Sequence, residues 1–400
     1  MKREMQAYNF DKPVVRRGTG CYKWDEENED GIIPMWVADM DFQTAPAIIA
    51  ALQRRVEHGV FGYTLVPESY YEAVISWFKR RHQWSIDRSW IQYTSGVVPA
   101  LSVIVKAFTQ PGDKVIVQTP VYNCFFSSIR NNGCEVVSAP LKNTLSAAGT
   151  LEYAMDFDML EQMASDEHAK ILILCNPHNP VGRVWSREEL MRVYNICKKH
   201  GVIVVSDEIH NELTYCGKRY VPYGVVDEGI ENAIICTSPS KSFNTAGLQI
   251  ANIICSNPEW REKIDRAINQ NEVCDVNPFG VVALQAAYNE SEEWLDSLCE
   301  YIYANYTSLK GFFEKNMPQF RIAPLEGTYL VWVDISAMNM SADEFTELLL
   351  KKGRVQVNSG TMYDPASGQC FIRLNIACPR SQMMEGLNRM LSVVNEHCTK

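Results

Sequence analysis

The sequence lacks any long hydrophobic run, and this absence excludes several classes of protein. None of its apolar stretches approaches the roughly 18 residues that a membrane-spanning helix needs. The first residues are charged or polar, and no apolar segment of the kind found in secretory signals follows them. We therefore expect a soluble, cytoplasmic protein that is not inserted in a membrane.

Cysteine pairs are also missing. The 13 cysteines are scattered, and no two of them form a Cys-x-x-Cys pair. That spacing is typical of zinc sites and of redox-active thiols, so the sequence predicts neither, and we expect no metal. An odd number of cysteines in a long chain without a secretion signal indicates reduced thiols, which are most often buried in the core.

Positive charge is scarce as well. The chain has 38 Lys and Arg residues against 48 Asp and Glu, a net charge of −10 at pH 7. Nucleic acids and anionic membrane surfaces are bound mainly through an excess of Lys and Arg, so we expect binding to neither. A dinucleotide-binding loop is missing too, because Gly18 and Gly20 follow no apolar strand and have no third glycine at the required spacing.

The sequence does contain enough apolar residues for a large enzyme with two domains. It has 400 residues, of which 46% are hydrophobic, and this length is too great for one small core. From about residue 46 to 285, strand and helix patterns alternate, which predicts an α/β domain with a mostly parallel central sheet covered by helices. A capping box at Ser186 and the glycine Gly201 bound one of these helices. The expected strands are 115–117, 135–137, 171–174, 202–205, 234–235 and 250–254.

Residues 286–400 follow a different pattern, which predicts a smaller α+β domain. A long helix comes first, and a capping box at Ser341 starts a second one. Strands are expected at 329–333 and 371–376, and a final helix at 381–396.

One lysine has a setting that suits covalent chemistry. Lys241 follows the apolar stretch 233–236 and is flanked by hydroxyl side chains. Its amine can form an imine with an aldehyde cofactor, and the hydroxyls can hold a phosphate. Pyridoxal 5′-phosphate (PLP) is the cofactor that needs both. The alternative is an ordinary solvated lysine after a strand.

Two other polar side chains follow expected strands, and ligands of such sheets bind beyond the carboxyl ends of the strands. Asn179 lies among prolines that forbid helix, so its amide is held at a strand end and can donate to a fixed oxygen. Asp207 ends the strand 202–205, where a carboxylate beside a pyridine nitrogen would keep that nitrogen protonated. An ordinary turn at Asn179 and a helix cap at Asp207 are the alternatives.

Taken in order, Asn-Pro-x-Gly at Asn179, the strand-end Asp207 and Ser-x-x-Lys at Lys241 resemble the fold-type I PLP enzymes, the superfamily of aspartate aminotransferase. Four further stretches narrow the resemblance to its branch of cystathionine β-lyases, or carbon–sulfur lyases. These stretches are residues 34–42, 95–100, 207–210 and 240–244, and the resemblance covers nearly the whole chain from about residue 30.

The resemblance implies the PLP-dependent transferase fold. Residues 46–285 would form the large PLP-binding domain, and residues 1–45 would pack with 286–400 in the small domain. The sequence around residues 95–99 adds a physical reason for phosphate binding, because Pro99 fits the first turn of an apolar helix and leaves amides free before it.

The resemblance also implies roles for single residues at the phosphate. The backbone amides of Gly96, Val97 and Val98 would bind the cofactor phosphate at a helix start, where the helix dipole favours an anion. The hydroxyls of Ser238 and Ser240 would add donors.

Further residues would hold the ring and the substrate. Tyr122 would stack on the pyridine ring and, with Asn179, contact the substrate. Asp207 would face the ring nitrogen, and Arg373 would clamp the α-carboxylate of an amino-acid substrate. Tyr63 would reach the phosphate of the partner subunit, which implies a homodimer.

Two positions depart from the aminotransferase pattern. Gln249 stands where those enzymes commonly have an arginine that grips the phosphate, and His210 stands where they have a tyrosine. The phosphate would therefore meet less compensating charge, and Tyr63 and the helix amides would matter more. His210 either bonds the phenolic oxygen of the cofactor or is an ordinary core histidine.

The expected reaction begins when the substrate amine displaces Lys241 from the imine and the freed lysine removes the Cα proton. Expulsion of a Cβ leaving group from cystathionine or a related cysteine S-conjugate would then give a thiol, pyruvate and ammonia, a reaction of methionine and cysteine metabolism. Return of the proton to the cofactor would give a class I aminotransferase, which is the alternative. The lyase-type stretches favour elimination, and the presence of both Lys241 and Asp207 disfavours a role in partner binding alone.

Overall fold

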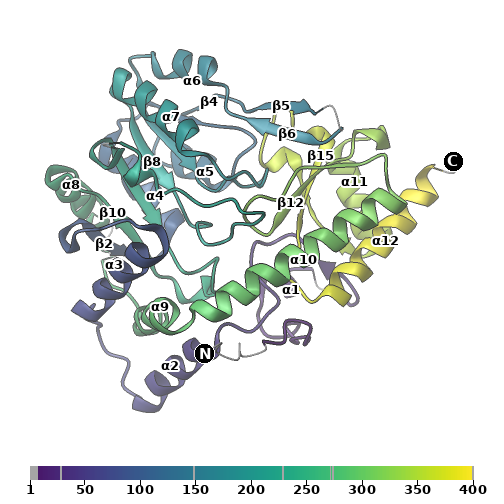
Figure 1. Ribbon diagram of the computed structural model, residues 1–400, viewed down its shortest axis with the longest axis horizontal. Helices are drawn as coiled ribbons and strands as arrows, with labels where there is room; N and C mark the ends of the chain where they lie inside the picture. The colour runs from purple at the N-terminus through teal and green to yellow at the C-terminus, as the bar shows by residue number, and fades with distance from the viewer. Residues whose placement is uncertain are drawn as a thin grey trace.

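The structure is a computed structural model that describes residues 8–27, 29–146, 149–227, 229–270, 272 and 274–398. Residues 1–7 of the expected small domain lie outside the described residues. Figure 1 shows a large sheet flanked by helices and, beside it, a smaller part that holds the C-terminal strands and helices. In the part of the chain that is described, no helix combines the length and apolarity needed to cross a membrane.

The large sheet has seven strands and is mostly parallel, which confirms the predicted α/β class. Strands β9, β8, β7, β3 and β4 run parallel to one another, and β10 pairs antiparallel with both β9 and β2. Six of the strands were expected, with ends that differ by no more than two residues, and β2 was not expected. In spatial order they are β2 (Ile91–Thr94), β10 (Ala251–Ile254), β9 (Ala233–Thr237), β8 (Ile203–Asp207), β7 (Ala169–Cys175), β3 (Lys114–Val117) and β4 (Glu135–Ser138).

Both faces of this sheet are covered, because its strands are apolar on both sides. In β7, Ile171 and Ile173 pack into one hydrophobic cluster, and Leu172 and Leu174 into another. The first cluster includes side chains of α4 (Val97–Phe108), α5 (Cys124–Arg130) and α8 (Pro258–Asn269). The second includes α3 (Glu68–His82), α6 (Phe157–Ala164) and α7 (Arg187–His200).

Local signals in the sequence set the helix ends. Helix α7 begins at the capping box that Ser186 forms with Glu189, and it ends at Gly201, which has a φ of 68°. The capping box at Ser341 likewise starts α11 (Ala342–Leu348). Both helix starts were predicted and are confirmed.

The smaller part is an antiparallel sheet with helices against it. Its strands are β11 (Arg321–Ile322), β12 (Leu330–Asp334), β15 (Phe371–Asn375) and β14 (Asn358–Ser359). Its main helices are α10 (Glu292–Asn316), α11 and α12 (Arg380–Cys398), and α10 packs against α12.

The N-terminal segment lies with this smaller part. After the short helix α1 (Tyr22–Asp25), strand β1 (Ile33–Pro34) pairs in parallel with β13 (Val355–Gln356). A hairpin of β5 (Lys142–Leu145) and β6 (Leu151–Ala154) extends from the large part toward it (Figure 1). Chain segments from both ends of the sequence therefore build the smaller part.

Helix α2 (Pro46–His58) lies at the lower edge of the molecule in Figure 1 and packs against α9 (Pro278–Glu290). The expected domain boundary after residue 285 falls inside α9. The loop that follows α2 exposes several large apolar side chains, namely Val60, Phe61, Tyr63 and Leu65. Such a concentration is unusual for a surface that faces only water.

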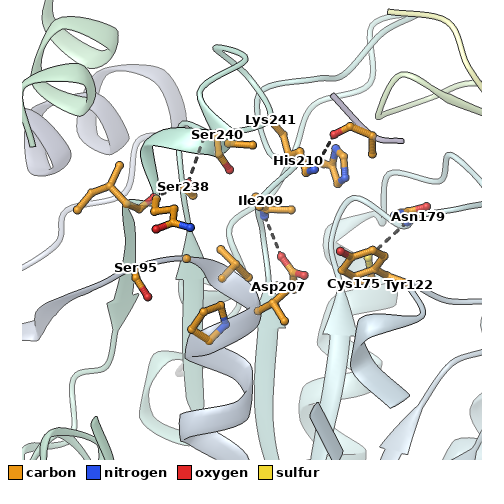
Figure 2. Close-up of a pocket in the computed structure, with 18 residues that line it drawn as sticks. Ser95, Tyr122, Cys175, Asn179, Asp207, Ile209, His210, Ser238, Ser240 and Lys241 are labelled. Atoms are coloured by element: carbon orange, nitrogen blue, oxygen red, sulfur yellow. Dashed lines mark hydrogen bonds between the residues drawn. The ribbon is translucent and has the colours of Figure 1, made fainter. Parts of the chain in front are cut away.

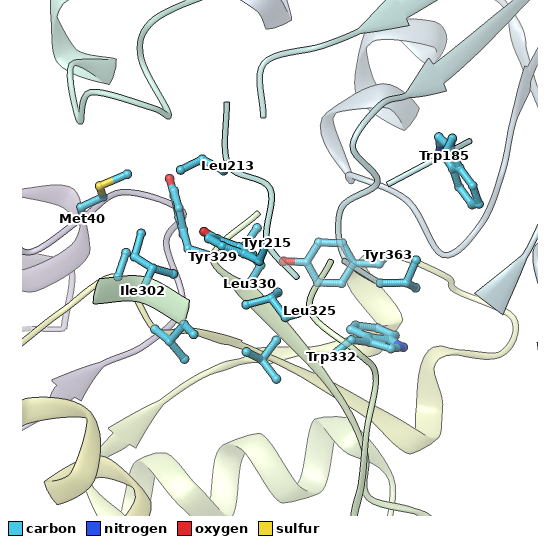
Figure 3. Packing of buried hydrophobic residues seen from close by; sticks show 14 of the residues in the cluster. Met40, Trp185, Leu213, Tyr215, Ile302, Leu325, Tyr329, Leu330, Trp332 and Tyr363 are labelled. Atoms are coloured by element: carbon cyan, nitrogen blue, oxygen red, sulfur yellow. The ribbon is translucent and has the colours of Figure 1, made fainter. Parts of the chain in front are cut away.

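The two parts share a hydrophobic core at their junction. Figure 3 shows Leu213 and Tyr215, from a loop after β8, packed near Leu325, Leu330 and other side chains of the smaller part. A backbone bridge between Thr214 and Gly327 ties the same segments together. This shared core holds the smaller part against the carboxyl edge of the large sheet.

Candidate functional site

A cavity opens at the carboxyl edge of the large sheet, where loops after β2, β7, β8 and β9 converge (Figure 2). Ten of the twelve residues predicted for the site line it: Gly96, Val97, Val98, Tyr122, Asn179, Asp207, His210, Ser238, Ser240 and Lys241. The other lining residues are Ala38, Ser95, Pro99, Cys175, Ile209, Ala246, Gln249 and Ile250. Segments that are far apart in the sequence thus form one site, as the positions at strand ends predicted.

One wall of the cavity is the start of α4. Gly96 is the N-cap of this helix, and no side chain caps it. The amides of Val97 and Val98 therefore lack a side-chain acceptor, and the positive end of the helix dipole lies at the cavity. This wall suits an anion such as a phosphate.

Lys241 lies partly buried on another wall. Its Nζ donates a hydrogen bond to the carbonyl oxygen of Ala38 at 2.6 Å. Desolvation lowers the pKa of Lys241 to about 8, against a smaller opposite effect from the charge of Asp39. A lysine with this pKa is partly neutral near neutral pH and is therefore suited to act as a nucleophile or a base.

Asp207 is buried at the end of β8. One of its carboxylate oxygens accepts a hydrogen bond from the amide of Ile209 at 3.1 Å, and burial raises the pKa of Asp207 to about 7. Residues 208–213 form turns, with no helix that Asp207 could cap. The helix-cap interpretation is thus excluded, and the carboxylate faces the cavity without a close cation.

Arg373 reaches the site from β15 and joins the smaller part to the larger one. It is buried, with one Nη donating to Oδ1 of Asn179 at 3.2 Å and the other to the carbonyl oxygen of Trp36 at 2.8 Å. Its guanidinium carbon lies 4.7 Å from the ring centre of Tyr363, and its Nε has no hydrogen-bond partner. A buried cation whose hydrogen bonds go only to neutral groups is suited to bind a carboxylate.

Asn179 is oriented by the same contact. Because its Oδ1 accepts from Arg373, its amide nitrogen remains as the donor at the cavity. This agrees with the predicted task of donating to a fixed oxygen.

His210 is buried in the cavity wall, and its Nδ1 has no hydrogen-bond partner. Burial, together with the charges of Lys241 and Arg373, lowers the pKa of His210 well below its ordinary value, so the ring is neutral. Its ring packs edge-on to Tyr329, with centroids 5.9 Å apart. An unpaired buried nitrogen at a cavity is not typical of an ordinary core histidine.

Tyr122 and the two serines occupy the remaining walls. The ring of Tyr122 packs edge-on to Phe125 at 5.9 Å, and burial raises the pKa of its hydroxyl. Ser238 donates its hydroxyl proton to the carbonyl oxygen of Ile250 at 2.7 Å and accepts from the amide of Ser240 at 3.1 Å. In this arrangement Ser238 supports the loop before Lys241, and Ser240 faces the cavity.

The positions of Tyr63 and Gln249 complete the description of the site. Tyr63 does not line the cavity of its own chain and is 98% exposed. Gln249 does line it, in a left-handed backbone conformation with a φ of 50°. Because Gln249 is neutral, this loop provides no arginine that could bind a phosphate at the start of α4.

Sequence reasoning missed the backbone that passes in front of Lys241. Residues 34–42 carry part of the family resemblance, but no role was given to Ala38, whose carbonyl accepts a hydrogen bond from Lys241. Tyr329 was missed as well, although its hydroxyl donates to the same carbonyl at 2.8 Å. Nothing in the sequence signals a contact made by a main-chain oxygen.

The site fits a group that is anionic at one end and electrophilic at the other. The uncapped start of α4 can bind the phosphate of PLP. The unpaired nitrogen of His210 can bind a polar substituent of the ring, and the carboxylate of Asp207 can pair with the ring nitrogen. Among the described residues, no group of three or more His, Cys, Asp or Glu side chains is placed to hold a metal ion.

Comparisons with known proteins agree with this geometry. Residues 31–390 match the model of the aminotransferase class I and II family. The cystathionine beta-lyase PatB of Bacillus subtilis is 40% identical over 97% of this chain and 100% of that protein. The crystal structure of cystalysin from Treponema denticola, which contains a pyridoxal 5′-phosphate cofactor, superposes with a TM-score of 0.93 at 35% identity and covers 98% of this chain and 100% of that one.

The structure of a PLP-bound C-S lyase from Staphylococcus hominis is similar too, with a TM-score of 0.89, 33% identity and coverage of 97% of this chain and 99% of that one. These likenesses span nearly the whole chain, so they concern both parts of the fold and the site between them. The chain therefore belongs to the aminotransferase class I and II family, in the branch that contains these cystathionine β-lyases.

Proposed function

We propose that this protein is a PLP-dependent carbon–sulfur lyase that releases a thiol, pyruvate and ammonia from cystathionine or a related cysteine S-conjugate. The observation that carries the proposal is that Lys241 and Asp207 line one cavity and Arg373 bonds Asn179 in its wall, each of the three without an opposite charge in close contact. The relatives named as cystathionine beta-lyase and C-S lyase support this chemistry over others of the same fold.

Particular residues would hold the cofactor. The start of α4 at residues 96–98, together with Ser240, offers donors to its phosphate, and Asp207 offers a carboxylate to its ring nitrogen. Asn179 and His210 offer nitrogen atoms to its ring substituents, and Tyr122 offers a face beside the ring. PLP bound there supplies an aldehyde carbon that bonds an amine and a ring that withdraws electrons from the neighbouring carbon.

The residues of the chain would then bind the substrate and move its protons. Arg373 binds the α-carboxylate through its free Nε and the remaining guanidinium hydrogens, which fixes the Cα–H bond in direction. Lys241, whose pKa is about 8, takes the Cα proton. The electron pair left on Cα forms a double bond to Cβ as the Cβ–S bond breaks. The sulfur leaves as a thiolate and becomes a thiol by taking up the proton that Lys241 holds. Water converts the remaining three-carbon fragment to pyruvate and ammonia.

Transamination by the same residues is the second candidate. It needs the same lysine, aspartate and arginine, so the arrangement of the site alone does not separate it from elimination. The lyase names of relatives at 40% and 33% identity favour elimination.

Product analysis separates the two reactions. Purified holoenzyme is incubated with L-cystathionine in the absence of any 2-oxo acid, and homocysteine and pyruvate are measured. Equal amounts of both are expected. If no thiol appears and amino-group transfer to an added 2-oxo acid dominates, the enzyme is an aminotransferase.

We further propose that the active unit is a cytoplasmic homodimer in which Tyr63 reaches the phosphate site of the partner. The 98% exposure of Tyr63 and the apolar loop around it support this arrangement. Within each subunit, residues 46–285 would act as the large domain, and residues 1–45 with 286–400 as the small one. Cysteine and methionine metabolism is the corresponding pathway.

A mixing experiment tests the position of Tyr63. Subunits with Tyr63→Ala and subunits with Lys241→Ala are unfolded, mixed and refolded together. If Tyr63 acts across the interface, each mixed dimer has one site with both residues, and thiol release recovers. If Tyr63 acts within its own subunit, no mixed dimer has such a site, and activity does not recover.

A further inference from the structure

One short backbone segment contacts the functional side chains of both parts of the molecule. We call residues 36–42 the alignment segment. It runs from β1 toward α2 and crosses the mouth of the site, where Ala38 lines the cavity. Six of its main-chain carbonyls, those of residues 36–40 and 42, accept hydrogen bonds from side chains.

On the side of the large sheet, the segment is tied to the loop that carries Lys241. The Ala38 carbonyl accepts from Nζ of Lys241 at 2.6 Å. Asn244, three residues later, donates its Nδ2 to the carbonyls of Met40 at 3.0 Å and Phe42 at 2.8 Å. Its Oδ1 accepts from the amide of Met40 at 3.0 Å. Asn244 thus makes three bonds to the segment, although it does not itself line the cavity.

On the side of the smaller part, the same segment is tied to β15. The Trp36 carbonyl accepts from Nη2 of Arg373 at 2.8 Å. Asn375, two residues along the strand, donates its Nδ2 to the carbonyls of Val37 at 2.5 Å and Asp39 at 2.6 Å. Residues Trp36 and Ala38 are two positions apart, so the contacts of Arg373 and Lys241 are set by one rigid stretch of backbone.

The outer side of the segment is fixed by charge. Arg16 bonds Asp39 at 2.6 Å and Asp41 at 2.7 Å, and Lys23 bonds Asp41 at 2.9 Å. Lys23 and Asp41 are both buried. Ion pairs in such surroundings break only at high cost, so the alignment segment has one conformation.

We propose that the alignment segment sets the distance and direction between the carboxylate-binding Arg373 and the base Lys241, and that Asn244 is the positioning residue that couples it to the lysine loop. This inference rests on the proposed function. Its physical basis is that proton removal from Cα requires the carboxylate and the base to be held in register, and a shift of about 1 Å can cost a rate factor of about 10².

The test compares two asparagines with the same backbone conformation. Asn244 has a φ of 53°, and so does Asn339, which is exposed and far from the site in sequence and contacts. Glycine accepts this conformation, so Asn244→Gly removes the three side-chain bonds without backbone strain, and Asn339→Gly is the matched control. Asn244→Asp, which keeps the acceptor and loses both donors, is a second variant.

Three measurements on holoenzyme are expected to change in Asn244→Gly and not in the control Asn339→Gly. The kcat/KM for thiol release falls about tenfold or more. The dissociation constant of L-alanine, which has no leaving group on Cβ and is followed by the visible spectrum, rises as well. Hydrogen exchange of the peptide that contains residues 36–42 becomes faster. Asn244→Asp changes all three in the same direction.

A double-mutant cycle tests the coupling itself. If the segment links the two residues, Asn244→Gly weakens L-alanine binding at least about threefold less in an Arg373→Lys background than in the wild type. Additive effects in the cycle would overturn the proposal, as would kcat/KM of Asn244→Gly within twofold of Asn339→Gly. Absence of thiol release by the wild type would instead refute the proposed function.

Discussion

The protein contains two buried sets of side chains that each include a lysine and an aspartate, one in the N-terminal segment and one in the cavity. They differ in the charges that lie next to each side chain. In the N-terminal set, Lys23 lies 2.9 Å from Asp41, and Arg16 bonds the same carboxylate at 2.7 Å. In the cavity, the amine of Lys241 bonds a neutral carbonyl, and Asp207 bonds a single amide.

The pKa values move in opposite directions as a result. Burial alone would lower the pKa of Lys23 and raise that of Asp41, but their mutual attraction raises the first and lowers the second. In the cavity, desolvation is only partly offset, and it brings the pKa of Lys241 to about 8 and that of Asp207 to about 7. The same residue types are therefore fixed charges in one place and proton-exchanging groups in the other.

The largest expected effect comes from removing the lysine of the cavity. Lys241→Ala should lower the rate of thiol release from L-cystathionine by about 10²–10⁴-fold, the usual contribution of a positioned base. Because the amine has no carboxylate partner in close contact, the free energy of unfolding of the apoprotein should not fall. Steady-state kinetics and urea denaturation test the two parts. A large loss of stability in this variant would show that Lys241 is a structural charge like Lys23.

Removing the lysine of the N-terminal set should have the reverse effect. Lys23→Met leaves the buried carboxylate of Asp41 with one cation fewer, and breaking a buried pair costs about 3–5 kcal/mol. Arg16 and Trp24 still bond Asp41, so the free energy of unfolding measured by urea denaturation should fall by about 3 kcal/mol. Lys23→Arg, which keeps the charge, should lose less. If Lys23→Met and the wild type have equal free energies of unfolding, Lys23 is not a structural charge.

The stability of the apoprotein should also depend on pH in a way that the cavity groups set. The pKa of Asp207 is raised, so the folded state binds a proton more tightly than the unfolded state, and stability falls as pH rises from about 4 to about 7. The pKa of Lys241 is lowered, so the folded state loses its proton first, and stability rises from about pH 8 to about 10.5. Each pKa unit corresponds to about 1.4 kcal/mol.

Two variants assign these slopes. Asp207→Asn should make the decline between pH 4 and 7 shallower, and the remaining decline belongs to Glu208, whose pKa burial also raises to about 7. Lys241→Met should remove the rise above pH 8. The pair of Lys23 and Asp41 cannot cause the decline between pH 4 and 7. The lowered pKa of Asp41 makes stability fall toward acid pH instead. Urea denaturation of apoprotein at a series of pH values measures all of this. A decline that is as steep in Asp207→Asn as in the wild type would show that Asp207 does not contribute to it.

The sequence alone predicted the sheet and most of the site because their signals are local. The apolar run of β8 ends at Asp207, and the run of β9 ends shortly before Lys241, so periodicity placed both side chains at one edge of a parallel sheet. The uncapped start of α4 was predicted for the same reason. Strand β2 was missed because its sequence, Ile-Gln-Tyr-Thr, lacks the apolar run that marks β7, β8 and β9.

Contacts that depend on tertiary structure were beyond reach. The pairing of Lys23 with Asp41 joins residues that no motif connects, and the sequence did not distinguish this lysine from Lys241 by any property except its neighbours. The bond between Ala38 and Lys241 uses a main-chain oxygen, which every residue has. The burial of Arg373 could not be predicted either, because it depends on how the smaller part packs against the large sheet.

Arg373 extends the comparison to a third buried cation, and its substitution should have the smallest effect. Its hydrogen bonds go to neutral oxygens of Asn179 and Trp36, so, like Lys241, it is placed for a charge that the chain does not provide. Arg373→Lys keeps the charge and loses the planar fork that grips a carboxylate in two places. The KM for L-cystathionine should rise about 10- to 100-fold, the worth of one or two hydrogen bonds to a charged group, with a smaller change in kcat. Arg321→Lys, at a half-exposed pair with Asp334, is the matched control and should leave KM unchanged. If KM of Arg373→Lys stays within threefold of the wild type, the carboxylate binds elsewhere, and Arg373 belongs with Lys23 among the structural charges.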